Sequence, residues 1–123
     1  MDVEDLKQGT KSFALRSIAL VEALPHTKTG EVIGKQLPRS ATSVGANYRS
    51  AIRARSRADF ISKLSIVIEE ADESLYWMEL LVDAKIIEQD RLALLTQEAD
   101  ELIAIFIASV KTVRSNNPRR QSI

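Results

Sequence analysis

The sequence of 123 residues contains no cysteine and only one histidine, His26. The absence of thiols excludes a disulfide framework, a cysteine nucleophile and a zinc–thiolate site. A single histidine also excludes the paired Glu-x-x-His motifs of a di-iron helix bundle. We therefore expect no metal and no cofactor, and we expect His26 to be an exposed loop residue.

Turn-forming and aromatic residues are also scarce, with four glycines, three prolines and an aromatic content of 5%. So little glycine and proline disfavours a fold of many short strands. The low aromatic content requires a core built from aliphatic side chains. A hydrophobic content of 45% and a charged content of 28% are typical of a globular chain. The length suits one domain, which we expect to span residues 1–123.

The chain has no long hydrophobic run. Its longest apolar segment covers residues 102–108, which is far too short to span a bilayer. The first eight residues, MDVEDLKQ, are acidic and mixed, unlike a signal peptide. These features predict a cytoplasmic protein with no membrane partner.

Apolar residues recur with helical period in four segments separated by short polar joins. The predicted helices cover about residues 10–24, 30–55, 56–85 and 90–114, and residues 115–123 are expected to be disordered. Ser56 is a candidate N-cap of the third helix, with Asp59 three residues later. Four helices with short connections predict an all-α, antiparallel, up-down-up-down bundle.

The face of each predicted helix follows from a rotation of 100° per residue. The first helix has a predicted core seam of Phe13, Ile18, Val21 and Leu24. The second has a predicted seam of Ile33, Leu37, Val44, Tyr48 and Ala51. Beside that second seam lie small residues that allow another helix to approach closely: Gly34, Pro38, Ala41 and Gly45.

Pro38 stands inside the second predicted helix, where proline removes a hydrogen bond and usually bends the axis. The seam keeps its phase across Pro38, which favours one kinked helix. Two helices broken at Leu37 are the alternative.

The third predicted helix has apolar residues on two faces. The face opposite its core seam carries Ile66, Tyr76, Trp77 and Leu80. A helix in a four-helix bundle needs only one apolar face, so this second face predicts an interface between subunits. The alternative is a set of scattered surface residues, which are common in monomers.

The net charge is zero, but the charges are unevenly distributed along the chain. Residues 1–63 contain eleven basic and six acidic side chains, and residues 64–123 contain six basic and eleven acidic ones. Lys35, Arg39, Arg49 and Arg53 share one face of the second helix, and Arg57 continues this basic stripe. Such a stripe is suited to binding nucleic-acid phosphates, and contacts of this kind do not depend on the base sequence. The alternative is an acidic helix lying beside a basic one, within or between subunits.

No set of residues indicates catalysis. Four acidic residues of the third helix, residues 69, 70, 72 and 73, point around the helix rather than at one cation. Residues 30–36 differ from a phosphate-binding loop in spacing, and no strand precedes them. Ser40 and Ser43 have no base at a recognisable spacing. We therefore predict that the protein is not an enzyme.

Several short stretches occur in the order typical of one known family. They are residues 13–16 (FALR), 21–25 (VEALP), 33–37 (IGKQL), 39–47 (RSATSVGAN), 58–61 (ADFI), 63–64 (KL), 70–73 (EADE), 76–77 (YW) and 108–112 (ASVKT). On these stretches, residues 10–114 resemble the four-helix-bundle proteins encoded in intervening sequences of bacterial large-subunit ribosomal RNA genes. The chain departs from the family pattern at Pro38, usually an aliphatic residue, and at Ser50, commonly an acidic one.

The resemblance implies a small bacterial protein that forms a ring-like homopentamer and binds RNA or DNA. A related branch, the accessory protein of diversity-generating retroelements, implies a reverse transcriptase as a further partner, although that branch is strongly basic and this chain is not. We predict a non-catalytic, oligomeric nucleic-acid-binding protein with phosphate contacts at Lys35, Arg39, Arg49, Arg53 and Arg57. The alternative is a protein-interaction scaffold whose basic stripe serves only self-assembly.

Overall fold

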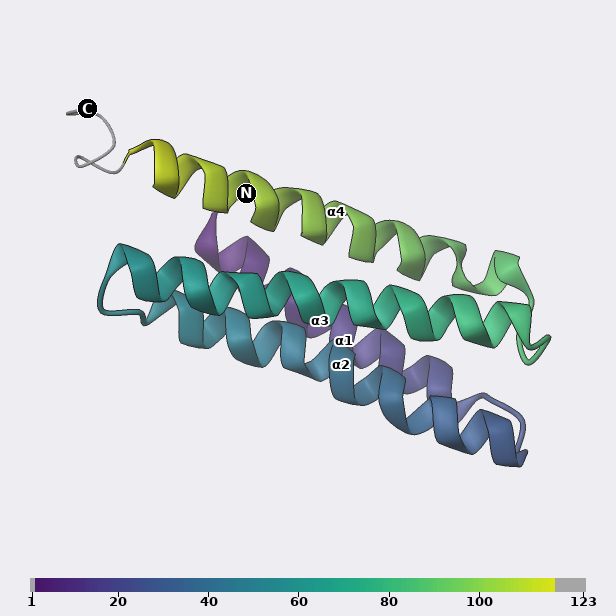
Figure 1. Ribbon diagram of the computed structural model, residues 1–123. Coiled ribbons are helices and arrows are strands. Elements are labelled where there is room, and N and C mark those ends of the chain that lie inside the picture. Colours follow the sequence, from purple (N-terminus) through teal and green to yellow (C-terminus); the bar gives the residue numbers. More distant parts are fainter. Residues whose placement is uncertain (1, 117–123) are drawn as a thin grey trace.

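The computed structural model describes residues 2–116, which form four α-helices and contain no strand. The helices are α1 (Val3–Glu22), α2 (Lys28–Ile52), α3 (Arg57–Asp83) and α4 (Gln89–Ser115). Each helix packs against the next along the chain, and α1 also contacts α4. The chain reverses direction at each turn, and the α2–α3 turn lies at the opposite end from the other two turns (Figure 1). The all-α prediction of four helices is confirmed.

Side-chain caps fix the first residues of three helices. The Asp2 carboxylate accepts a hydrogen bond from the Asp5 backbone at 2.8 Å. Thr27 caps α2 in the same way through the Gly30 N–H, and Ser56 caps α3 through the Asp59 N–H at 3.0 Å. The predicted cap at Ser56 is confirmed, because a hydroxyl at this position satisfies an N–H that the first helical turn leaves unpaired.

The predicted start of the first helix at residue 10 was wrong, because the cap at Asp2 begins α1 at Val3. The other helix boundaries differ from the predicted ones by one to three residues. Ser115 lies in α4 and Asn116 is its C-cap, so the prediction of disorder from residue 115 was wrong for these two residues. Residues 117–123, which include Arg119 and Arg120, lie outside the described part of the chain.

Pro38 lies inside α2, which continues without a break from Lys28 to Ile52. The prediction of one helix is confirmed, and the alternative break at Leu37 is wrong. Proline has no N–H, so the Gly34 carbonyl loses its usual helical donor. The Thr42 hydroxyl donates a hydrogen bond to the Pro38 carbonyl at 2.7 Å. Packing of α2 against both α1 and α3 holds the helix together across this position.

The core contains the predicted seam of α2, whose five residues are all buried. Tyr48 packs against Phe106 of α4 with ring centroids 5.4 Å apart, which links the two diagonal helices. The prediction for α1 was wrong at Ile18, which is 38% exposed. Thr10 and Ser17 are buried on that side instead. Their hydroxyls donate to backbone carbonyls four residues earlier, so they enter the core with their hydrogens satisfied.

Two of the small residues of α2, Gly34 and Gly45, lie against α1, so the predicted close approach of another helix is confirmed at these positions. A Cβ added to Gly34 would lie 3.3 Å from Cγ1 of Val21, and one added to Gly45 would lie 3.4 Å from the Thr10 hydroxyl oxygen. The two helices therefore approach each other closely at both glycines. Among residues 2–116, no helix has an apolar stretch of the length needed to cross a membrane.

Candidate nucleic-acid interface

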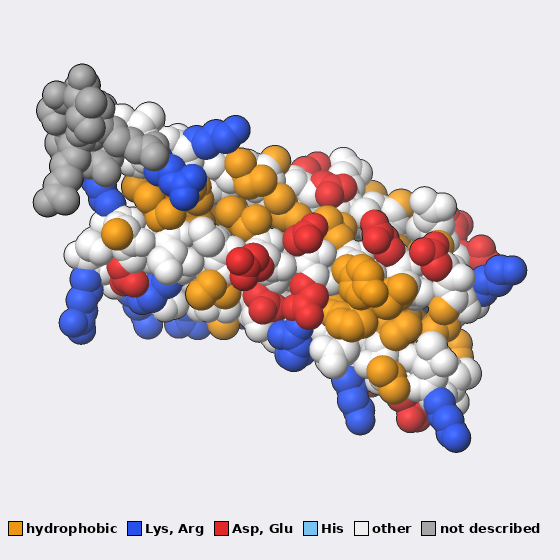
Figure 2. All heavy atoms as spheres, in the orientation of Figure 1, with side chains coloured by type: hydrophobic (Ala, Val, Ile, Leu, Met, Phe, Trp, Pro, Cys, Tyr) orange, Lys and Arg blue, Asp and Glu red, His pale blue; other side chains and the backbone are white. Residues whose placement is uncertain are grey.

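The outer face of α2 carries three exposed cations that have no carboxylate partner in the described part of the chain. Lys35, Arg49 and Arg53 are exposed, and none of them forms an ion pair with another residue in the range 2–116. Basic side chains line the edge of the molecule formed by α2, and acidic side chains gather over the middle of α3 and α4, while further basic side chains lie near the C-terminal end of α4 (Figure 2). On the face that is drawn, the basic edge of α2 and the acidic cluster over α3 and α4 are therefore separate regions.

Arg39, the fourth predicted cation of α2, is engaged within the chain. Its guanidinium donates to the Glu70 carboxylate at 3.4 Å and also to the Glu73 carboxylate. The hydrogen bond to Glu73 raises the pKa of the Arg39 guanidinium, and partial burial raises the pKa of the Glu70 carboxyl. At Arg39, the alternative of an acidic helix beside a basic one within the fold is confirmed.

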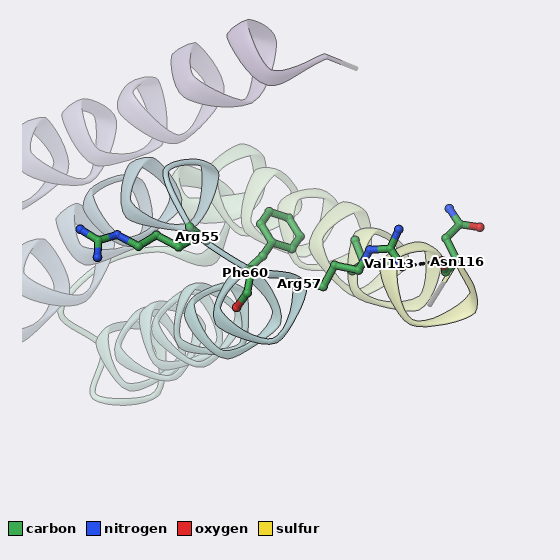
Figure 3. A pocket seen from close by; sticks show the side chains of 7 residues that line it. Arg55, Arg57, Phe60, Val113 and Asn116 are labelled. Atoms are coloured by element: carbon green, nitrogen blue, oxygen red, sulfur yellow. Dashed lines mark hydrogen bonds between the residues drawn. The ribbon is translucent and has the colours of Figure 1, made fainter. Parts of the chain in front are cut away.

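Arg57, the last predicted cation of the stripe, also has a partner inside the fold. Its Nη1 donates to the backbone carbonyl of Asn116 at 2.6 Å. Figure 3 shows this bond beside a pocket at the α2–α3 turn, with the Arg55 side chain directed away from it. Cations are favourable at a helix C-terminus, where carbonyls lack helical donors. This contact gives Arg57 a structural role at the end of α4.

Two cations of α1, which the sequence prediction did not include, join Arg49 at one groove. This groove between α1 and α2 has a volume of about 430 Å³, with Lys7 and Lys11 on one side and Arg49 on the other. Lys7 pairs with Glu4 at 3.4 Å, whereas Lys11 has no ionic partner among residues 2–116. The spacing of four residues between the two lysines placed them on one helical face, but only the packing of α1 on α2 brings them to Arg49.

The second apolar face of α3 is only partly exposed. Ile66 is 40% exposed and Tyr76 is 52% exposed, whereas Trp77 and Leu80 pack partly against the core. Tyr76 and Trp77 form an edge-to-face pair with centroids 5.2 Å apart. The Trp77 Nε1–H is buried and has no hydrogen-bond acceptor in the described structure. The apolar surface visible on this side lies next to acidic side chains (Figure 2).

Metal-binding geometry is not found in the described part of the chain. No three histidine or carboxylate side chains among residues 2–116 are grouped as metal ligands. Among the acidic residues of α3, Glu70 and Glu73 pair with Arg39, Asp59 pairs with Lys63, and residues 69, 72, 79 and 83 are exposed.

Comparison with known proteins identifies the family. The family model of the 23S rRNA-intervening sequence proteins matches residues 4–108. The chain belongs to this family. The resemblance seen in the sequence motifs is thereby confirmed.

The solved structure of a similar protein also supports the assignment of this chain to the 23S rRNA-intervening sequence proteins. It is the crystal structure of a protein of unknown function from the S23 ribosomal protein family of Bacteroides thetaiotaomicron. The two chains are 37% identical, the alignment covers 90% of this chain and 99% of that one, and the TM-score is 0.83. A comparison with curated proteins gave no match.

Proposed function

We propose that this 23S rRNA-intervening sequence protein is a non-catalytic nucleic-acid-binding protein that contacts phosphates through the outer face of α2. The observation that supports it most is the set of unpaired cations at Lys35, Arg49 and Arg53. Cations without internal partners are free to neutralise phosphates and release their counterions. The family description, which refers to 23S rRNA, makes RNA the first ligand to test.

The proposal reduces the predicted stripe from five cations to three. Arg39 and Arg57 already donate to groups inside the fold, so a phosphate would have to compete with those contacts. Lys35, Arg49 and Arg53 have no such contact with another side chain in residues 2–116. One subunit therefore offers few charges, and a single copy would bind weakly.

The proposal also includes a homo-oligomer, with a ring-like pentamer as the expected form. The exposed Ile66 and Tyr76, together with the partly buried Trp77 and Leu80, supply an apolar surface for a second copy. Its acidic surroundings would suit a cationic region of the neighbouring subunit. A ring repeats the three free cations in every subunit, and this multivalency raises the overall affinity without new contacts.

A pair of matched charge reversals tests the proposal. The variant Arg49→Glu/Arg53→Glu changes the net charge as much as the control Lys85→Glu/Arg91→Glu, whose exposed cations lie at the α3–α4 turn and the start of α4. Fluorescence anisotropy with labelled RNA should show that the first variant binds with at least about tenfold lower affinity than the wild type, because two charge-assisted contacts are lost. The control should keep the affinity of the wild type. Equal losses in both variants would contradict binding at α2.

The pairing of Arg39 with Glu70 and Glu73 favours a second candidate, a scaffold in which cations and acids serve assembly alone. Sedimentation of the same variants separates the two candidates. If Arg49→Glu/Arg53→Glu keeps its helicity but dissociates into monomers, the stripe belongs to the subunit interface and the scaffold is supported. If it keeps the mass of the wild type and loses RNA, nucleic-acid binding is supported.

A further inference from the structure

The groove between α1 and α2 has basic side chains along its sides and small residues along its bottom. Gly45, Ala46 and Ala14 line it, so backbone rather than long side chains forms much of its floor. The close contact of Gly45 with Thr10 keeps the two helices near each other beneath the groove. A ligand can therefore enter between the two rows of side chains.

Electrostatic groups around the groove favour an anion. Lys7, Lys11 and Arg49 line it together with one carboxylate, that of Glu4. The ion pair between Lys7 and Glu4 is exposed, so it contributes little stability and can rearrange. Lys11 and Arg49, on opposite sides of the groove, have no ionic partner among the residues that the structure describes.

The hydrogen bonds inside the groove show which groups can donate to a ligand. The Thr10 hydroxyl donates to the Leu6 carbonyl, and the Thr42 hydroxyl donates to the Pro38 carbonyl. Their hydrogens are thus already used. Donation to a ligand falls to Lys11, Arg49, the remaining N–H groups of Lys7 and the Gln8 amide, which has no partner within residues 2–116. Cationic donors with a neutral amide are suited to a phosphodiester.

Among the described residues, no aromatic side chain lines this groove, so these residues offer no platform on which a base can stack. A duplex is stiff and presents its phosphates on a convex surface, so it would touch the rim and not the floor. A single strand can place one sugar–phosphate unit between the helices. We infer that the α1–α2 groove binds the sugar–phosphate backbone of single-stranded nucleic acid, with Lys11 and Arg49 on the phosphate. This inference rests on the proposed function and makes it specific to single strands.

A substitution that fills the groove without changing any charge tests this inference. Ala46 is exposed and lines the groove, so Ala46→Leu places a larger apolar side chain there. The matched control is Ala104→Leu, at an exposed alanine of α4 that does not line it. The probes are a labelled single-stranded RNA of about 16 nucleotides, its DNA counterpart and the corresponding duplex. Comparison of the RNA probe with the DNA probe shows which nucleic acid supplies the sugar–phosphate backbone.

We expect Ala46→Leu to weaken single-strand binding by about tenfold, which corresponds to the loss of one charge-assisted contact. Duplex binding and the Ala104→Leu control should stay at the affinity of the wild type. If Ala46→Leu alters the thermal midpoint or the mass, Thr42→Leu replaces it, because the Thr42 hydroxyl bonds only to its own helix.

The outcomes separate this inference from the proposed function. If the filled variants bind single strands as well as the wild type does, while Arg49→Glu/Arg53→Glu does not bind, the groove is not the site and the proposed function stands. The inference is also overturned if the wild type binds the duplex and the single strand with equal affinity and filling the groove changes neither affinity. If the wild type binds none of the three probes at low salt, both the inference and the proposed function are lost.

Discussion

Gly45 of α2 lies directly against Thr10 of α1, and a Cβ added to Gly45 would be 3.4 Å from the Thr10 hydroxyl oxygen and 3.5 Å from its Cβ. A methyl group at Gly45 would just reach van der Waals contact, and anything larger would have to move Thr10. This contact sets the spacing of the two helices that carry Lys11 and Arg49. The geometry of the basic groove therefore depends on a residue that carries no charge.

The first prediction concerns this contact. Gly45→Leu should lower the free energy of unfolding by about 1–3 kcal/mol, because the added side chain overpacks the α1–α2 interface. The control is Gly9→Ala in α1, where the nearest atom to an added Cβ is 4.0 Å away. That variant should gain up to about 1 kcal/mol from helix propensity. Urea unfolding followed by circular dichroism measures both changes, and a neutral Gly45→Leu would show that the helices can separate freely.

A second prediction concerns the ion pairs that connect α2 and α3. Arg39→Glu should destabilise the fold, because it places a third carboxylate beside Glu70 and Glu73. The double variant Arg39→Glu/Glu73→Arg, in which the two charges are exchanged, should regain stability. Since these side chains are partly exposed, the coupling should not exceed about 1 kcal/mol and should shrink in high salt. A double-mutant cycle with no coupling at low salt would contradict this role of Arg39.

A third prediction uses the buried N–H of Trp77. A buried donor without an acceptor costs about 1–3 kcal/mol, and phenylalanine removes the donor while keeping an aromatic ring. Trp77→Phe should therefore change the free energy of unfolding by less than about 1 kcal/mol. Trp77→Glu should dissociate the assembly or unfold the chain, because it buries a charge. A strongly destabilised Trp77→Phe would indicate that the indole N–H has an acceptor on a neighbouring subunit.

The fourth prediction concerns alkaline pH. Burial raises the pKa of the Tyr48 phenol, and the charges of Asp2 and Glu4 add to this effect. The folded protein then keeps a proton that the unfolded chain releases above about pH 10, so the stability from Tyr48 falls as the pH rises past that value. Tyr48→Phe should flatten this fall in urea titrations between about pH 8 and pH 11. Tyr76→Phe is the matched variant, since its ring is 52% exposed, and an identical pH dependence in both variants would contradict the assignment.

The sequence predicted the four helices and most of the core, because apolar residues at helical spacing dominate both. It failed at α1, where Ile18 is exposed and Thr10 and Ser17 are buried. A hydroxyl that bonds to its own helix behaves as a small core residue, and apolar periodicity does not detect it. Apolar periodicity also does not detect the buried pair Ser40 and Ser74, whose hydroxyl oxygens lie 2.9 Å apart.

The candidate site was less predictable than the fold. The helical wheel predicted that Arg39 shares one face of α2 with Lys35 and Arg53, but the partners of Arg39 depend on how α3 is rotated against α2. Lys11 joins Arg49 for a similar reason, since the register between α1 and α2 decides which side chains share a groove. Periodicity within one helix gives its faces, but it does not give the register between two helices.

The central claim is that the free cations of α2 bind nucleic-acid phosphates, and the salt dependence of the affinity of the wild type tests it most directly. The measurement is the anisotropy of a labelled single-stranded RNA titrated with the protein at a series of salt concentrations. With three phosphate contacts from Lys35, Arg49 and Arg53 in one engaged subunit, the logarithm of the affinity should fall linearly with the logarithm of the salt concentration, with a slope of about −2. Absence of binding at low salt, or an affinity that salt does not change, would contradict the claim.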